Sequence, residues 1–425
     1  MPAPVLLQPR QYASVPGKFQ LLPLLPIQEP SKHLPGEIWN EIFVHALSHE
    51  IAGVSPWCWN LLEVCKYFRD IALPLVYSKI QLTAVPSLEK FYHRLHTAEQ
   101  KWDSIRRIPY STPGRWVQVL DLSELAWTGQ FQALCLDSIL TSLLPLIPFL
   151  AELYINPSFV LSRRALHSLA DREGAANLRV LGGLTYLAHL SSAPDEDPFI
   201  QLLRCCPNLE QLDIVGQGLE PVDHEWLPPV ELFPMAHFRP LKLPRLRVLS
   251  LLSMNSSHLM HALLYTPLPS LRKLTLTPYN DLPYPNSLAS ALITMHGASL
   301  GSLLLFTPKA WPTRLRPTPD DLFIVAPKLR HLSLENPLPN LILSEPHNLR
   351  ILSIPRPKSD YWRILERLFS NLPNLSVIRA RDVRWLRKGI SSMAQDTGVQ
   401  GEMREWRRRL ARRRIRLLDA DWKED

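Results

Sequence analysis

One short phrase recurs along this chain and constrains its fold more than any other feature. An aliphatic residue, two variable residues, a central aliphatic residue, one variable residue and a further aliphatic residue follow one another, as in Leu246-Arg-Val-Leu249-Ser-Leu251. The central residue of each copy stands at 120, 153, 181, 212, 249, 274, 303, 332, 352 and 378, so the gaps run from 20 to 37 residues. Self-similarity on this scale predicts structural units that stack on their neighbours.

Each copy ends in alternating apolar and polar residues, as a strand with one buried face does. Several copies follow a Pro-x-Leu step, where proline ends a preceding helix. Helical stripes lie between copies at 199–206, 259–265, 288–295 and 361–368. A strand and a helix in every period predict an α/β solenoid with parallel strands on one side and helices on the other. Proline-rich insertions at 216–243 and 307–319 are expected to leave this array as loops.

The copies resemble leucine-rich repeats in an irregular form, without the Asn or Cys that usually follows the Leu-x-Leu. The resemblance implies that variable strand positions face outward on the concave side and bind a protein client. The candidate positions are Asp121, Tyr154, Gln211, Asp213, Arg247, Arg272, Lys273, Arg330, His331 and Arg350. Early copies carry acids and later copies carry bases there, which predicts either a client of matching polarity or a solvated charged face.

The segment before the repeats, residues 31–80, has a helical pattern. Pro35 supplies the preset φ of a helix start, and Glu37 follows in the first turn, where a negative charge favours the helix dipole. Apolar residues at 38, 39, 42, 43, 46 and 47 form one amphipathic stripe. A second stripe runs from Leu61 to Ala72 and is predicted to end before Pro74. Such a small helical unit must pack on a neighbour or a partner.

The order of residues in this segment resembles the F-box of fungal F-box proteins. It reads Leu34-Pro35, Glu37-Ile38 and Ile42-Phe43, then Val64-Cys65-Lys66 and Phe68-Arg69. The resemblance implies a Skp-type adaptor as partner and, through it, a cullin–RING ubiquitin ligase. The residues that would contact the adaptor are Leu34, Pro35, Ile38, Ile42, Leu61, Val64, Cys65 and Phe68. The alternative is that these residues form the core of an ordinary helical domain.

The two ends of the chain differ in composition. Residues 1–30 carry seven prolines and predict a disordered leader, whose Leu-Leu-Pro run could dock in a groove. Residues 379–416 hold 13 of the 47 Lys and Arg residues but only 4 of the 39 Asp and Glu residues. Within them Met403, Trp406, Leu410 and Leu417 have helical spacing, so we expect a helix that caps the last repeat, a nuclear-import signal or a nucleic-acid surface.

The sequence thus predicts a disordered leader at 1–30, an F-box at 31–80, a leucine-rich-repeat-like solenoid at 81–378 and a basic cap at 379–425. It contains no Gly-rich phosphate loop, no His-Glu-x-x-His and no paired-Cys metal spacing, so we expect neither catalysis nor a cofactor. Five cysteines without a Cys-x-x-Cys pair indicate a reduced compartment, cytoplasmic or nuclear. The most apolar stretch, 139–155, is interrupted by prolines, which predicts no membrane span.

These expectations together indicate a substrate-recognition subunit of an SCF-type ligase, which binds the adaptor through the F-box and a client through the repeats. One alternative is a leucine-rich-repeat scaffold outside any ligase. The other is a nucleic-acid-associated protein that works through its basic end. Nucleic acid is not expected as a partner, because no interleaved aromatic residues or base-reading module accompany the arginines.

Overall fold

The computed structural model describes residues 34–48, 61–101, 112–187, 194–216, 239–254, 257–277, 288–307, 319–336, 338, 341–385 and 398–424. The chain divides into two compact units, residues 1–76 and 77–425, which we describe separately. The predicted leader at 1–30 and most of the predicted loops at 216–243 and 307–319 lie outside the described residues.

The first unit is helical. It contains α1 (Gly36–Ser48), a helical turn at 61–64 and most of α3 (Lys66–Ser78). Three aromatic rings form its centre: Trp39 and Phe43 of α1 pack against Phe68 of α3, with centroid distances of 4.6 Å from Trp39 to Phe68 and 5.1 Å from Phe43 to Phe68. Phe43 is buried, with only 3% of its surface exposed. Part of the stripe predicted from the sequence, Trp39 and Phe43, therefore supplies the helix contact.

Helix α3 does not end before Pro74 as the sequence predicts, but continues through this proline to Ser78. Proline inside a helix removes one hydrogen bond and costs about 3 kcal/mol. Burial of the residues around Pro74 offsets this cost, since Ala72, Val76 and Tyr77 are all buried. Burial of their apolar surface thus outweighs the local preference of Pro74.

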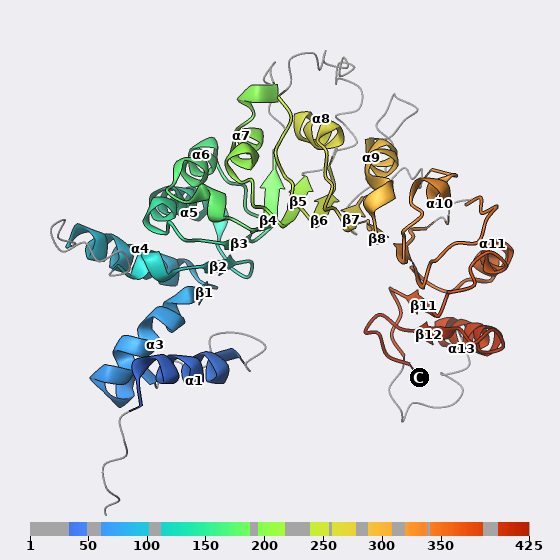
Figure 1. The fold of residues 1–425 in the computed structure, drawn as a ribbon, viewed down its shortest axis with the longest axis horizontal. Coiled ribbons are helices and arrows are strands. Elements are labelled where there is room, and N and C mark those ends of the chain that lie inside the picture. Colours follow the sequence, from blue (N-terminus) through green and yellow to red (C-terminus); the bar gives the residue numbers. More distant parts are fainter. Residues whose placement is uncertain are drawn as a thin grey trace, which may run out of the picture. The chain divides into compact units, whose positions relative to one another are not determined.

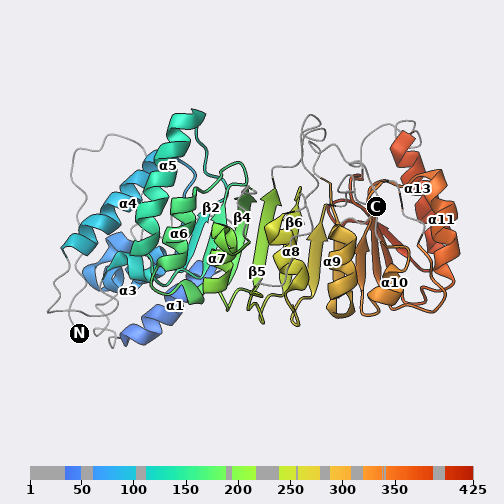
Figure 2. The ribbon, with the colours of Figure 1, turned by 90° about the horizontal axis from the view of Figure 1, so that it is seen from above.

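The second unit is built on one parallel sheet whose 12 strands follow chain order. Figures 1 and 2 show helices along one face of this sheet, while none of the described helices of this unit lies on its other face, called the open face below. The strands are β1 (Lys79–Gln81), β2 (Val119–Leu122), β3 (Glu152–Ile155), β4 (Val180–Tyr186), β5 (Gln211–Gly216), β6 (Val248–Leu252), β7 (Lys273–Leu276), β8 (Ser302–Leu305), β9 (His331–Ser333), β10 (Ile351–Ile354), β11 (Val377–Ala380) and β12 (Arg416–Leu418).

Helices follow most of the strands. They are α4 (Val85–Gln100), α5 (Gly129–Leu143), α6 (Arg163–Asp171), α7 (Pro198–Cys205), α8 (His258–Tyr265), α9 (Leu288–His296), α10 (Leu322–Val325), α11 (Ser359–Phe369) and α13 (Gly398–Ala411). Short 3₁₀ turns are η2 (Pro113–Trp116), η3 (Leu144–Leu146), η4 (Ala175–Asn177), η5 (Pro194–Glu196) and η8 (Gly297–Ser299). Helices α7, α8, α9 and α11 lie where the sequence stripes predict them.

All ten central aliphatic residues of the recurring phrase lie in strands β2 to β11 and pair with one another in register. Leu120 lies opposite Leu153, Leu249 opposite Leu274, and Leu352 opposite Ile378. The same row begins at Ile80 of β1 and ends at Leu417 of β12. The prediction of an α/β architecture with parallel strands is confirmed, and its core is this row together with the buried faces of the helices.

The C-terminal segment differs in part from its prediction. Met403, Trp406 and Leu410 lie on one buried stripe of α13, as expected. Leu417, however, is not on that helix, because the chain leaves it after Ala411 and enters β12, which pairs with β11. The helical extension to Leu417 is therefore wrong: pairing with the exposed edge of β11 satisfies backbone groups that would otherwise stay unpaired.

Strand β4 contains a local irregularity. Its register against β5 shifts between Leu181 and Leu184, so that two glycines, Gly182 and Gly183, occupy a bulge. Gly183 has φ of 68°, and a Cβ atom there would lie 2.1 Å from the carbonyl oxygen of Ile155. Only glycine fits this position without displacing the neighbouring strand.

Candidate interaction surfaces

Helix α1 exposes a second apolar face in addition to the one that packs on Phe68. Ile38 and Ile42 are four residues apart and therefore share a side of the helix. Their exposed fractions are 43% and 42%, and Leu34 just before the helix is exposed to 41%. Val64, in the helical turn at 61–64, is exposed to 62%. Apolar side chains in such number on a small helical unit are typical of an interaction surface.

The predicted adaptor-binding residues thus fall into two groups. Six of them have exposed side chains, namely Leu34, Pro35, Ile38, Ile42, Val64 and Cys65. Leu61 and Phe68 are half-buried, and Phe68 belongs to the aromatic centre of the unit. The Sγ atom of Cys65 accepts a hydrogen bond from the amide of Phe68 at 3.4 Å, which places it at the start of α3.

Six of the predicted client-binding residues lie within strands of the second unit. They are Asp121, Tyr154, Gln211, Asp213, Lys273 and His331. Each stands one position from a buried central aliphatic residue, so it points to the open face. Asp121 is held by Ser123, whose amide and hydroxyl both donate to its Oδ1. Tyr154 donates to Glu152 at 3.0 Å, and burial together with this carboxylate raises the pKa of Tyr154 to about 12.

His331 is engaged by other residues of the open face. Its Nε2 lies 3.0 Å from the hydroxyl of Ser353, and its ring meets that of Trp422 edge to face, with 6.0 Å between centroids. Burial, with the positive charges of Arg379 and Lys273, lowers the pKa of His331 to about 4. His331 is therefore neutral near pH 7. Trp422 also covers Arg379, whose guanidinium carbon lies 4.3 Å from the indole centroid.

The other four predicted client-binding residues, Arg247, Arg272, Arg330 and Arg350, do not lie on the open face. Each directly precedes its strand, so they line the edge at which the strands begin. Their backbones are linked in one row, in which the amide of Arg272 donates to Arg247, that of Arg330 to Gly301 and that of Arg350 to Arg330. Each stands two positions before its central aliphatic residue, so strand alternation does not direct it to the open face as the sequence analysis expected. That these arginines bind a client stays a prediction.

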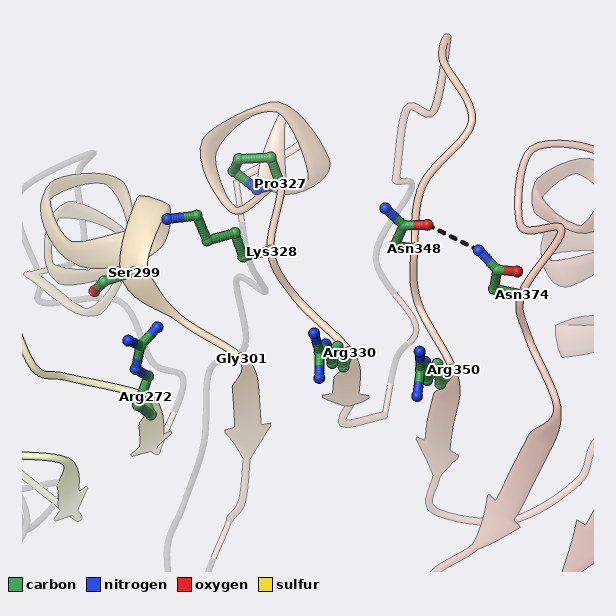
Figure 3. A pocket seen from close by; sticks show the side chains of 9 residues that line it. All are labelled: Arg272, Ser299, Gly301, Pro327, Lys328, Arg330, Asn348, Arg350 and Asn374. Atoms are coloured by element: carbon green, nitrogen blue, oxygen red, sulfur yellow. Dashed lines mark hydrogen bonds between the residues drawn. The ribbon is translucent and has the colours of Figure 1, made fainter.

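Three of these arginines surround a hollow of about 600 Å³, which we call the edge groove. Figure 3 shows its lining, which is Arg272, Ser299, Gly301, Pro327, Lys328, Arg330, Asn348, Arg350 and Asn374. It contains four cationic side chains and no carboxylate. The groove is shallow, since the three arginines and Lys328 are all exposed.

The sequence analysis did not identify Gly301, Lys328, Asn348 or Asn374 as parts of a site. A usable signal was present: two residues before each central aliphatic residue the chain carries Arg247, Arg272, Gly301, Arg330 and Arg350 in succession. These positions contain the arginines at the edge of the sheet and Gly301, which stands between Arg272 and Arg330.

Within the described parts of the chain, no group of three or more His, Cys, Asp and Glu residues is arranged to hold a metal ion. None of the helices there combines the length and the apolar character that crossing a membrane requires.

Comparison with known proteins gives little. No family model matches the sequence, and no curated protein matches it. Among solved structures, the complex of Rad7 and Elc1 in yeast is similar at 15% sequence identity, over 84% of this chain and 90% of that chain, with a TM-score of 0.29.

Proposed function

We propose that this protein is a non-catalytic substrate-recognition subunit of a cullin–RING ubiquitin ligase. In this proposal the first unit binds a Skp-type adaptor, and the repeats of the second unit hold a protein client. The observation that carries it is the exposed apolar face of α1, where Ile38 and Ile42 are exposed although the same helix already buries Phe43. An ordinary helical core would bury these residues, whereas a docking helix exposes them.

The F-box-like order of residues in the first unit also supports a Skp-type adaptor as the partner. Leu34, Ile38 and Ile42 are the positions that the F-box resemblance assigns to adaptor contact, and all three are exposed. Interface anchors of this type dominate binding energy, because a few apolar residues at the centre are fully desolvated in the complex. The aromatic centre of Trp39, Phe43 and Phe68 holds the helix that presents them.

The test is a pull-down of purified Skp-type adaptor with the full chain and with an Ile38→Ala/Ile42→Ala variant. Loss of two anchors is expected to weaken binding by about 2 to 4 kcal/mol. The matched control is Phe131→Ala/Leu134→Ala on α5, a pair that is exposed to 80% and 71% but lies in the second unit. This control is expected to bind as the unchanged chain does.

A second measurement concerns the ligase itself. When the tagged chain is purified from cells that express it, we expect a cullin to be recovered together with the adaptor. Both should be lost with the Ile38→Ala/Ile42→Ala variant. Adaptor binding without cullin would instead favour the leucine-rich-repeat scaffold outside a ligase. If the unchanged, folded chain does not bind the adaptor at all, the proposal is overturned.

A further inference from the structure

The edge groove is open in its centre because Gly301 has no side chain. In the row that precedes the strands, Arg272, Gly301, Arg330 and Arg350 follow one another on adjacent strands. Neighbouring strands are about 4.8 Å apart, so Arg272 and Arg330 stand on either side of an empty position roughly 10 Å wide. A Cβ atom on Gly301 would meet only the carbonyl oxygen of Arg272, at 3.7 Å. Glycine here leaves space between two cations and is not demanded by the backbone.

The polar groups that line the groove are arranged to donate hydrogen bonds. The amide of Asn374 donates to Oδ1 of Asn348 at 2.8 Å, which occupies the acceptor of Asn348 and leaves its NH₂ group directed away from Asn374 (Figure 3). Ser299 is not one of these donors, because the single hydrogen of its hydroxyl is already donated to the carbonyl oxygen of His296. The three guanidinium groups and the ammonium group of Lys328 have only donors. The lining thus suits a compact ligand rich in acceptors.

Charge and shape together select the kind of acceptor. A carboxylate has one negative charge and two oxygens, which a single arginine can satisfy. A phosphate monoester carries about −1.5 to −2 charges at pH 7 and three strong acceptor oxygens, so it matches several arginines around one position. A single-stranded nucleic acid would call for aromatic side chains on which bases stack, and none lines the groove.

We propose that the edge groove binds a phosphate group carried by the protein client, with Arg272, Arg330 and Arg350 as its principal ligands. The source of the phosphate rests on the proposed function, whereas its chemistry rests on the groove alone. Gly301 provides the space that the phosphate fills, and Lys328 contributes a further positive charge at its rim.

The test measures fluorescence anisotropy of a labelled pool of short peptides with one fixed phosphoserine and neutral flanks, titrated with the full chain. A pool with glutamate at the fixed position and a pool with serine serve as comparisons, and inorganic phosphate serves as competitor. Saturable binding of the phosphoserine pool is expected, with displacement by inorganic phosphate and much weaker binding of the other two pools.

Three variants separate a built groove from a diffuse basic surface. Arg330→Gln removes a ligand and is expected to weaken binding by about 10- to 100-fold, the usual effect of losing a charge-assisted hydrogen bond. Gly301→Gln fills the hollow without changing the charge, and a similar loss is expected. The matched control is Arg179→Gln, an exposed arginine that directly precedes β4 and does not line the groove; it should change binding less than twofold.

The outcomes are distinct. Equal losses in Arg330→Gln and Arg179→Gln, full binding by Gly301→Gln, or equal binding of the glutamate pool would each overturn the proposal. The proposal would also be overturned if an oligoribonucleotide bound more tightly than the phosphoserine pool and Gly301→Gln left that binding unchanged. Thermal unfolding of every variant verifies that it is folded. Adaptor binding is measured on the same preparations, because its failure alone would overturn the proposed function but leave phosphate binding intact.

Discussion

Arg381 Nη2 donates to Glu335 Oε1 at 2.6 Å and so joins the segment that follows β11 to the segment that follows β9. The exposed fractions of these side chains are only 14% and 12%. Arg381 Nη1 also donates to the carbonyl oxygen of Leu305 and to the hydroxyl of Ser333, while Glu335 accepts from the amide of Thr307. One arginine thereby connects the ends of several neighbouring strands.

Replacement of this arginine is expected to destabilise the second unit. Arg381→Gln leaves a nearly buried carboxylate without its charge partner, so the free energy of unfolding should fall by about 3 kcal/mol at neutral pH. Urea unfolding followed by tryptophan fluorescence measures the loss. A change below about 0.5 kcal/mol would show that Glu335 is stabilised by its other partners alone.

The same variant has a pH dependence whose sign follows from the pKa of Glu335. Burial raises this pKa in the folded chain, and Arg381 opposes the rise. Without Arg381 the pKa rises further. A carboxyl with a raised folded pKa contributes stability below its unfolded pKa and loses that contribution as pH rises through the folded pKa. The difference between Arg381→Gln and the unchanged chain should therefore be smaller near pH 4.5 than at neutral pH.

Two glycines with left-handed backbones allow a matched comparison. Gly183 and Gly129 have φ of 68° and 74°, but only at Gly183 would a Cβ atom meet a neighbouring backbone. Gly129→Ala is expected to cost about 1 to 2 kcal/mol, the usual penalty of this conformation. Gly183→Ala should cost clearly more, because it also displaces Ile155. Equal midpoints in urea unfolding would indicate that β3 and β4 separate easily at the bulge.

Asp197 is a buried carboxylate with three partners. Its Oδ1 accepts from the amides of Phe199 and Ile200 at the start of α7, and Tyr186 donates to its Oδ2 at 2.7 Å. Asp197→Ala should cost about 2 to 4 kcal/mol, since it removes a helix cap and the hydrogen bond that the Tyr186 hydroxyl donates to Asp197. Asp197→Asn retains the cap and should lose less. Thermal unfolding of both variants, and of Tyr186→Phe, tests this order.

Helix α13 is held by its apolar stripe, and Arg409 adds a contact with Trp362 of α11, since its guanidinium carbon lies 5.3 Å from a ring centroid of Trp362. Trp406 is buried and packs edge to face on Trp362 of α11, with 5.4 Å between centroids. Trp406→Ala is expected to cost about 3 to 5 kcal/mol. Arg408→Gln/Arg412→Gln, which alters exposed side chains of the same segment, should stay within about 0.5 kcal/mol. The reverse order in urea unfolding would contradict the description of this helix as a cap.

The sequence predicted the repeating part of the fold because each phrase contains its own signal. A buried central residue such as Leu249, with its alternating neighbours, requires one strand and one register. The repeated phrase does not extend to β1, in which Lys79, Ile80 and Gln81 form a short strand directly after a helix. Strand β12 was missed because Leu417 continues the helical spacing of Met403, Trp406 and Leu410, and only the exposed edge of β11 decides otherwise.

The sites were harder to predict, for a different reason. The apolar face of α1 follows from local spacing, so Ile38 and Ile42 could be singled out from the chain alone. The edge groove depends on lateral neighbours: Arg272, Gly301 and Arg330 are far apart in the sequence and meet only through strand pairing. The contacts of His331 with Ser353 and Trp422 likewise join separate segments, and no local sequence pattern predicts them.

The row of central aliphatic residues also bears on how such a chain can change over generations. Leu212 and Leu249 are 37 residues apart in the sequence, whereas Leu332 and Leu352 are only 20 apart, yet both pairs are direct partners on adjacent strands. An insertion or deletion between two strands therefore leaves their register, and with it the spacing of Arg272, Arg330 and Arg350, unchanged. Loop length and the arrangement of these arginines are thus structurally independent, so either one can change while the other is kept.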